Sequence, residues 1–149
     1  MAESKNDGWA GTINGRPETG QSAERSRTTS MADIEAFTAI SGDRNPLHYD
    51  EELAKASPFG RLVVQGGIIS GILNAVVAED LPGPGTVFME THHKFLKPIG
   101  VGETMTGRVE ITDVRADKPI CKMEVSVVNG DGETCLSGTA TTYTMPLTP

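Results

Sequence analysis

The sequence predicts a single α+β domain in which an antiparallel sheet wraps around one long apolar helix. Its 149 residues suit one core, since a domain of this size buries roughly two thirds of its unfolded surface. The segment 67–79 is apolar around its whole circumference, so a helix there must be surrounded by other structure. The segments after it have the pattern of successive strands with short connections, which is typical of an antiparallel sheet.

The N-terminal segment contrasts with the rest of the chain. The first two dozen residues are rich in glycine, serine, glutamate and arginine, with only Trp9 and Ile13 as sizeable apolar side chains. Such a composition contributes little to a core. We therefore expect residues 1–17 to form a flexible arm and residues 18–149 to form the folded domain.

Three helices are expected in the first half of the chain. The first begins at Ser30, which with an acidic residue three positions on can satisfy the free first-turn amides, and extends to about Ile40. The second covers residues 51–56 and ends before Pro58. The apolar helix over 67–79 ends at a segment rich in proline and glycine.

Four strands are expected after that break, because apolar residues alternate with polar ones between glycine and proline turns. They cover residues 86–97, 103–115, 119–128 and 133–145. Their order predicts a meander, in which each strand pairs with the next. Cys121 and Cys135 then face about Ala140 and Ser126 across the last hairpin, with sulfurs on the order of 15 Å apart. That separation excludes a disulfide, so two reduced thiols are expected.

The charge and hydropathy of the chain exclude several partners. A formal net charge of -7 argues against binding of nucleic acid or anionic membranes. The apolar stretch from Leu62 to Ala78 is broken by polar residues and glycines, and it is shorter than the roughly 20 residues of a membrane span. The N-terminus has no apolar core of the signal-peptide kind, so a cytoplasmic location is expected.

The segment 42–48, Gly-Asp-Arg-Asn-Pro-Leu-His, is the most informative for function. Proline fixes its own backbone and disfavours a helical residue before it, so a rigid, non-helical loop is expected to present Asp43 and His48. A carboxylate and an imidazole together can move a proton on and off a water molecule near neutral pH. Taken alone, such a pair is more often part of a loop held by local hydrogen bonds.

The wider segment from Phe37 to His48, with Ala54 beyond it, resembles the signature of the MaoC-like, R-specific enoyl-CoA hydratases. The shared anchors are the aromatic residue, Ser-Gly-Asp, Asn-Pro-Leu-His and the small residue that follows. The resemblance covers about Glu18 to Met145 and continues through further segments. These are 61–66, 81–85, 95–98 and 102–103.

The resemblance implies a hotdog fold, which is an antiparallel sheet around one long helix, and a homodimer or higher homo-oligomer with its acyl pocket at the interface. It implies reversible syn addition of water to trans-2-enoyl-CoA, giving (R)-3-hydroxyacyl-CoA. Asp43 and His48 would hold one water, and the amide of Gly66 would stabilise the enolate oxygen. No metal or organic cofactor is implied, because the thioester itself activates the substrate.

Asn45, Gln65 and Gly67 are the expected substrate-binding residues. The family usually has histidine at the position of Gln65 and a bulky apolar residue at that of Gly67. Glutamine forms hydrogen bonds but does not titrate, so a role that needs a second imidazole would be absent. We expect these two departures to alter the pocket and its chain-length preference more than the chemistry.

Other polar residues have weaker claims to function. His92 and His93 are adjacent on an expected strand, where they point to opposite faces, so structural roles are expected for both. Four basic residues are candidates for the phosphates of coenzyme A, although an ordinary solvated surface explains each equally well. They are Arg44, Arg61, Lys94 and Lys97.

Two alternative functions are compatible with the same fold. A hotdog acyl-thioesterase generally uses a carboxylate near the central helix, but the segment 65–78 contains none. A non-catalytic acyl-thioester-binding or partner subunit has no need of Asp43 or His48. The sequence leaves open the acyl length and branching, the choice between coenzyme A and acyl-carrier-protein thioesters, the direction of reaction, and which of Asp43 and His48 is the base.

Overall fold

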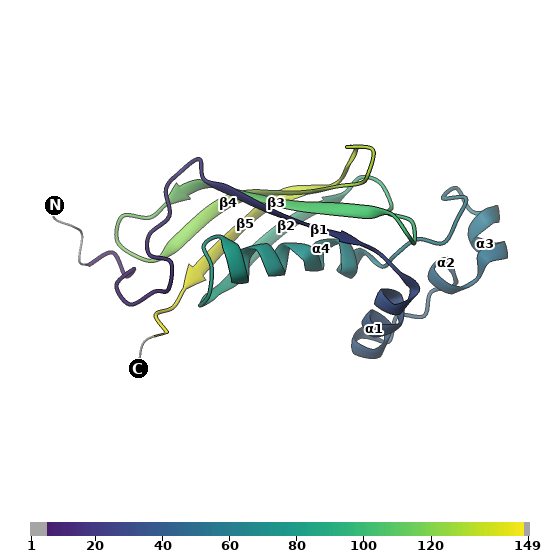
Figure 1. The fold of residues 1–149 in the computed structure, drawn as a ribbon, viewed down its shortest axis with the longest axis horizontal. Coiled ribbons are helices and arrows are strands. Elements are labelled where there is room, and N and C mark those ends of the chain that lie inside the picture. The colour runs from purple at the N-terminus through teal and green to yellow at the C-terminus, as the bar shows by residue number, and fades with distance from the viewer. Residues whose placement is uncertain (1–5, 148–149) are drawn as a thin grey trace.

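The computed structural model describes residues 6–147, which form a five-stranded antiparallel sheet with one long helix against one face (Figure 1). The strand order is β1-β3-β4-β5-β2. The strands are β1 (Ser22–Thr28), β2 (Thr86–Phe95), β3 (Thr104–Val114), β4 (Ile120–Val128) and β5 (Thr134–Thr144). The helices are α1 (Met31–Ser41), α2 (Pro46–Tyr49), α3 (Glu51–Ala56) and α4 (Gly66–Ala75), which the π-helical turn η1 (Val76–Asp80) extends. This is the hotdog fold that the resemblance implies.

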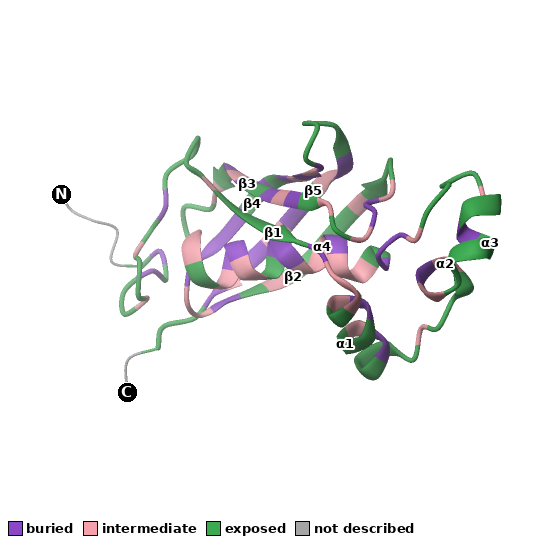
Figure 2. Ribbon diagram, turned by 45° about the vertical axis from the view of Figure 1, so that its right-hand side comes forward, coloured by how far each residue is buried: buried purple, intermediate pink, exposed green. Residues whose placement is uncertain are grey.

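Helix α4 packs one face against the concave side of the sheet, where buried residues of both elements meet (Figure 2). Ile69 and Leu73 on this face are buried. The opposite face carries Gly67, Gly71 and Ala75, which remain partly exposed. The expectation that other structure surrounds the helix on every side is therefore wrong for the single chain.

The sheet corrects the predicted meander. Strands β3, β4 and β5 pair in succession, but β2 pairs with β5 and lies at one edge of the sheet. The other edge is β1, which pairs with β3 and was not predicted as a strand. Its residues are mostly exposed, so it lacks the apolar alternation that identifies a strand from sequence.

The N-terminal segment also differs from expectation. Trp9 is only 4% exposed and belongs to the hydrophobic core. Arg16 pairs with Asp7 at 3.3 Å and donates to the backbone carbonyls of Val114 and Arg115, which ties the segment to the end of β3. The expectation of a loose arm is thus wrong for residues 6–17, because one buried tryptophan contributes a large apolar surface. Residues 1–5 lie outside the described residues.

The two cysteines are buried and free, as predicted. Burial raises the pKa of the Cys121 thiol to about 12. Cys121 pairs with Thr142 rather than Ala140: the pairing nearest the turn, Val128 with Thr134, is already one residue beyond the predicted register, and a bulge between Val127 and Val128 adds one more. Over residues 6–147, no helix is both long and apolar enough to cross a membrane.

Candidate active site

Helix caps position the segment between α1 and α2. Ser30 caps α1 in a reciprocal capping box with Asp33, as expected, and Gly42 ends the helix at φ +80°. Asn45 caps α2 through its side-chain oxygen, which accepts from the amide of Leu47 at 3.1 Å. Asp43 lies between these two caps.

His48 lies in a helix, which corrects the expectation of a non-helical loop. Pro46 occupies the first turn of α2, where its missing N–H is no loss because first-turn amides have no partner within a helix. The short helix turns His48 inward, so that its side chain is 9% exposed, against 38% for Asp43. The proline therefore begins a helical turn here instead of preventing one.

The structure brings the predicted acid–base pair together. His48 Nε2 lies 3.6 Å from Asp43 Oδ2. His48 Nδ1 lies 2.6 Å from the carbonyl oxygen of Val63, which can only accept, so Nδ1 carries a proton. In the neutral imidazole, Nε2 is then an unprotonated acceptor facing the carboxylate. The sequence gives no signal for Val63, because it acts through a backbone atom.

A pocket of about 310 Å³ adjoins this pair. His48 and Gly66 both line it, together with mainly apolar side chains that include Ile69 and Phe95. Asp43 does not line the pocket itself and adjoins it through the contact with His48. The site thus places a neighbouring carboxylate and imidazole beside a mainly apolar cavity large enough for part of an acyl chain.

Gly66 is the first residue of α4, at the positive end of the helix dipole. Within the part of the chain that the structure describes, the amides of Gly66 and Gly67 have no hydrogen-bond acceptor. A Cβ on Gly66 would lie 3.2 Å from the ring of Phe95, so the glycine leaves this approach open. These amides are available to an oxyanion.

The other three predicted site residues lie differently. Gln65 is 1% exposed and its Nε2 donates to α1, to the carbonyl of Ile34 and to Thr38 Oγ1, each at 3.2 Å. Gln65 does not line the pocket beside His48, and its contact with substrate stays a prediction. Asn45 is exposed and donates its backbone amide to Asp43 Oδ1 at 3.0 Å, which orients the carboxylate.

Gly67 lines a separate apolar groove between α1 and α4. The ring of Phe37 lies so close that a Cβ on Gly67 would be 2.0 Å from its nearest carbon. The glycine makes room for this ring, and it does not line the pocket beside His48. Its expected contact with substrate also stays a prediction.

The remaining candidates fit structural or surface roles. His92 is exposed and lies 3.3 Å from Glu90, whereas burial and the neighbouring His92 lower the pKa of His93. Among the basic residues, Arg61 pairs with Glu103 and Lys97 with Glu133, while Arg44 and Lys94 are exposed. In residues 6–147, no three acidic, histidine or cysteine side chains gather as a metal site would require.

The fold and this site together define a hotdog protein with an acid–base pair beside the N-terminus of its central helix. Residues 12–132 match the family described as MaoC like domain, so the chain belongs to that family of hydratases and dehydratases.

Two curated relatives and one solved structure resemble the chain closely. The chain is 33% identical over 123 residues to an (R)-specific enoyl-CoA hydratase of Aeromonas caviae, covering 83% of this chain and 92% of that protein. It is 27% identical over 124 residues to a mitochondrial 3-hydroxyacyl-[acyl-carrier-protein] dehydratase of Solanum lycopersicum, covering 82% and 74%. The solved structure, an (R)-hydratase from A. caviae involved in PHA biosynthesis, aligns with a TM-score of 0.83 at 32% identity, covering 86% and 97%.

Proposed function

We propose that this protein is an R-specific enoyl-CoA hydratase, which adds water reversibly to trans-2-enoyl-CoA to give (R)-3-hydroxyacyl-CoA. The observation that carries the proposal is the pair of acceptors, Asp43 Oδ2 and His48 Nε2, held 3.6 Å apart beside an apolar pocket. The similarity to the A. caviae hydratase supports this reaction and this substrate class.

The geometry suits one water molecule. Two acceptors 3.6 Å apart can each take one of its hydrogens, which leaves an oxygen lone pair for attack on C3 of the substrate. Because Val63 keeps the Nδ1 proton of His48, Nε2 is the atom that accepts the proton of the attacking water. Asp43 holds the second hydrogen and stabilises the imidazolium that forms.

The proton that leaves the attacking water is the proton that C2 finally receives, and His48 carries it between them. As the C3–O bond forms, one O–H bond of water breaks, the proton moves to His48 Nε2, and the thioester becomes an enolate. The amide of Gly66 donates to the enolate oxygen, at the end of α4 where negative charge is favoured. His48 then returns the proton to C2 from the face on which the oxygen was added, which gives syn addition.

We also propose that the acting form is a homodimer joined at β2. Strand β2 is an edge of the sheet, and its exposed side chains include the large apolar residues Val87, Met89 and Phe95. An exposed edge with such side chains favours pairing with another strand. Phe95 also lines the pocket, so a partner at this edge would border the site.

The test is to mix the purified protein with a series of trans-2-enoyl-CoA esters of increasing length. We expect loss of the conjugated enoyl absorbance without thiol release, and chiral analysis should identify the (R)-3-hydroxyacyl product. Thiol release would instead indicate a thioesterase, and the (S) product would contradict the stereochemistry. Turnover of acyl-carrier-protein thioesters alone would show that the proposed carrier is wrong.

A further inference from the structure

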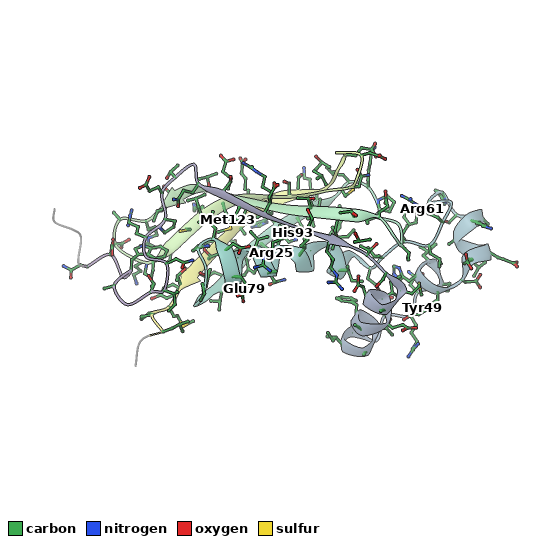
Figure 3. The ribbon with its side chains drawn as sticks, viewed as in Figure 1. Arg25, Tyr49, Arg61, Glu79, His93 and Met123 are labelled. Carbon is green, nitrogen blue, oxygen red and sulfur yellow. The ribbon has the colours of Figure 1, made fainter. Side chains whose placement is uncertain are left out.

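Thr38, on the buried side of α1, lies at the centre of a hydrogen-bond network that the proposed reaction does not yet use. It is 5% exposed. Its hydroxyl contacts the carbonyl of Asp43 at 2.8 Å, Gln65 Nε2 at 3.2 Å and the hydroxyl of Tyr49. Figure 3 shows Tyr49 where α1 and α2 approach each other, so the network links these two helices to the residue just before α4.

The chemistry of the partners determines every donor and acceptor. A carbonyl oxygen only accepts, so the single hydrogen of Thr38 goes to Asp43. The amide nitrogen of Gln65 only donates, which occupies one lone pair of the hydroxyl oxygen. Tyr49 must then donate to the other lone pair. The Thr38 hydroxyl is thereby fully satisfied in one arrangement.

This arrangement is unusual for a threonine in a helix. A helical threonine commonly donates back to the carbonyl four residues earlier, which here is Ile34. Gln65 Nε2 donates to the Ile34 carbonyl at 3.2 Å, and Thr38 donates forward past the end of α1 to Asp43. The Thr38 hydroxyl is therefore hydrogen-bonded to the backbone of Asp43, whose side chain is the carboxylate of the proposed pair.

The network joins the two parts of the proposed site. At one end is the backbone of Asp43, which follows Gly42. Gly42 ends α1 with a left-handed backbone conformation. At the other end is Gln65, the residue immediately before Gly66. Gln65 Nε2 donates both of these hydrogen bonds between α1 and the residue before α4.

We propose that Thr38, held by Gln65, is a positioning residue that sets the carboxylate of Asp43 relative to His48 and the amide of Gly66. This inference rests on the proposed hydratase function. Thr38 does not line the pocket, and Asp43 is the proposed catalytic residue to which its hydroxyl hydrogen-bonds directly. Misplacement of a catalytic group by about 1 Å can lower a rate on the order of 100-fold. The loss should therefore fall on kcat rather than KM.

The experiment compares Thr38→Val, which keeps the shape but removes the hydroxyl, with Thr38→Ser, which keeps the hydroxyl. We expect kcat for enoyl-CoA hydration to fall about 10- to 100-fold in the valine variant, with KM within about threefold. The serine variant should stay within about threefold of the wild type in both constants. Tyr49→Phe is the matched control, because it removes a contact to Thr38 and leaves the bond to Asp43.

Dependence on Asp43 separates positioning from a general structural role. In an Asp43→Asn background, adding Thr38→Val should change the residual rate by less than about twofold. An equal fall in both backgrounds, or a valine variant as active as the serine variant, would overturn the proposal. If the valine variant does not fold, Thr38→Ala removes the same hydroxyl without added bulk and is judged by the same criteria.

A second measurement does not depend on turnover. The NMR resonances of the His48 ring, recorded at one fixed pH, should shift when Asp43→Asn replaces the neighbouring carboxylate, and this shift should be smaller in Thr38→Val protein than in the wild type. An undiminished shift would contradict the positioning role even if the wild type hydrated no enoyl-CoA. Absence of wild-type hydration with a diminished shift would contradict the proposed function and leave the positioning role supported.

Discussion

Gly67 and Gly71 lie one turn apart on the same face of α4 and offer a matched pair of alanine substitutions. In a helix interior, replacing glycine by alanine stabilises by about 0.5–1 kcal/mol. A Cβ on Gly71 meets no atom within 4 Å, so Gly71→Ala should keep this gain. For a domain of this size the gain corresponds to a rise in Tm of about 1–4 °C.

Gly67→Ala should have the opposite sign. Its Cβ would lie 2.0 Å from a ring carbon of Phe37, which is 1.4 Å short of the 3.4 Å at which ordinary contact begins. Overpacking of a core costs about 1–3 kcal/mol, and subtracting the helix-propensity gain of about 0.5–1 kcal/mol leaves a net loss of up to about 2.5 kcal/mol, so Tm should fall by up to about 10 °C. Displacement of Phe37 should also disturb the adjacent Thr38. The rate of enoyl-CoA hydration should therefore be lower in the Gly67→Ala variant than in the Gly71→Ala variant.

Thermal unfolding followed by circular dichroism measures both variants under identical conditions. The comparison is informative because both substitutions add one methyl group to one helix. If Gly67→Ala raised Tm as much as Gly71→Ala, Phe37 would not occupy the space that the structure assigns to it. The explanation for glycine at position 67 would then be wrong.

Three further predictions concern burial. Because burial raises the pKa of Cys121 to about 12, a thiol reagent at pH 8 should not label it in the native protein and should label it after denaturation; fast native labelling would contradict this. Trp9→Ala should lower the free energy of unfolding by about 3–5 kcal/mol in urea titrations. A loss below about 1 kcal/mol would show that Trp9 is not part of the core and that the N-terminal segment is a flexible arm after all. Burial and the neighbouring His92 lower the pKa of His93, so the folded state favours its neutral form. The stability that His93 contributes is therefore fully present above about pH 6.5, the unfolded value, and should diminish as the pH falls below it. Unfolding free energies measured between pH 7.5 and 5 should therefore decline less in His93→Gln than in wild type, and equal declines would refute the assignment.

The sequence predicts those features of the fold that depend on local chemistry. Ser30 caps its helix as expected, because capping uses residues within one turn. Strands β3, β4 and β5 are recognisable because buried and exposed residues alternate along much of their length, and the central helix because its segment is almost uniformly apolar. Strand β1 and Trp9 were misjudged, because a mostly exposed edge strand and a single buried side chain leave no periodic signal.

The site follows the same division. Asp43 and His48 stand in one motif, and caps that the motif itself supplies bring their side chains together, as the sequence predicts. The carbonyl of Val63, which selects the protonated nitrogen of His48, depends on how a distant backbone segment packs. Gln65 was expected in the pocket, but its side chain turns toward α1, and only the three-dimensional arrangement reveals its partner Thr38.

The central claim is that Asp43 and His48 act as one unit on a single water molecule, and a double-mutant cycle on kcat for enoyl-CoA hydration tests it most directly. Asp43→Asn and His48→Gln should each lower kcat on the order of 100- to 10,000-fold in folded protein. Groups that act as a unit are not additive, so the double variant should be no slower than the slower single variant. A double variant whose loss equals the product of the two single losses, or a single variant with wild-type turnover, would contradict the claim.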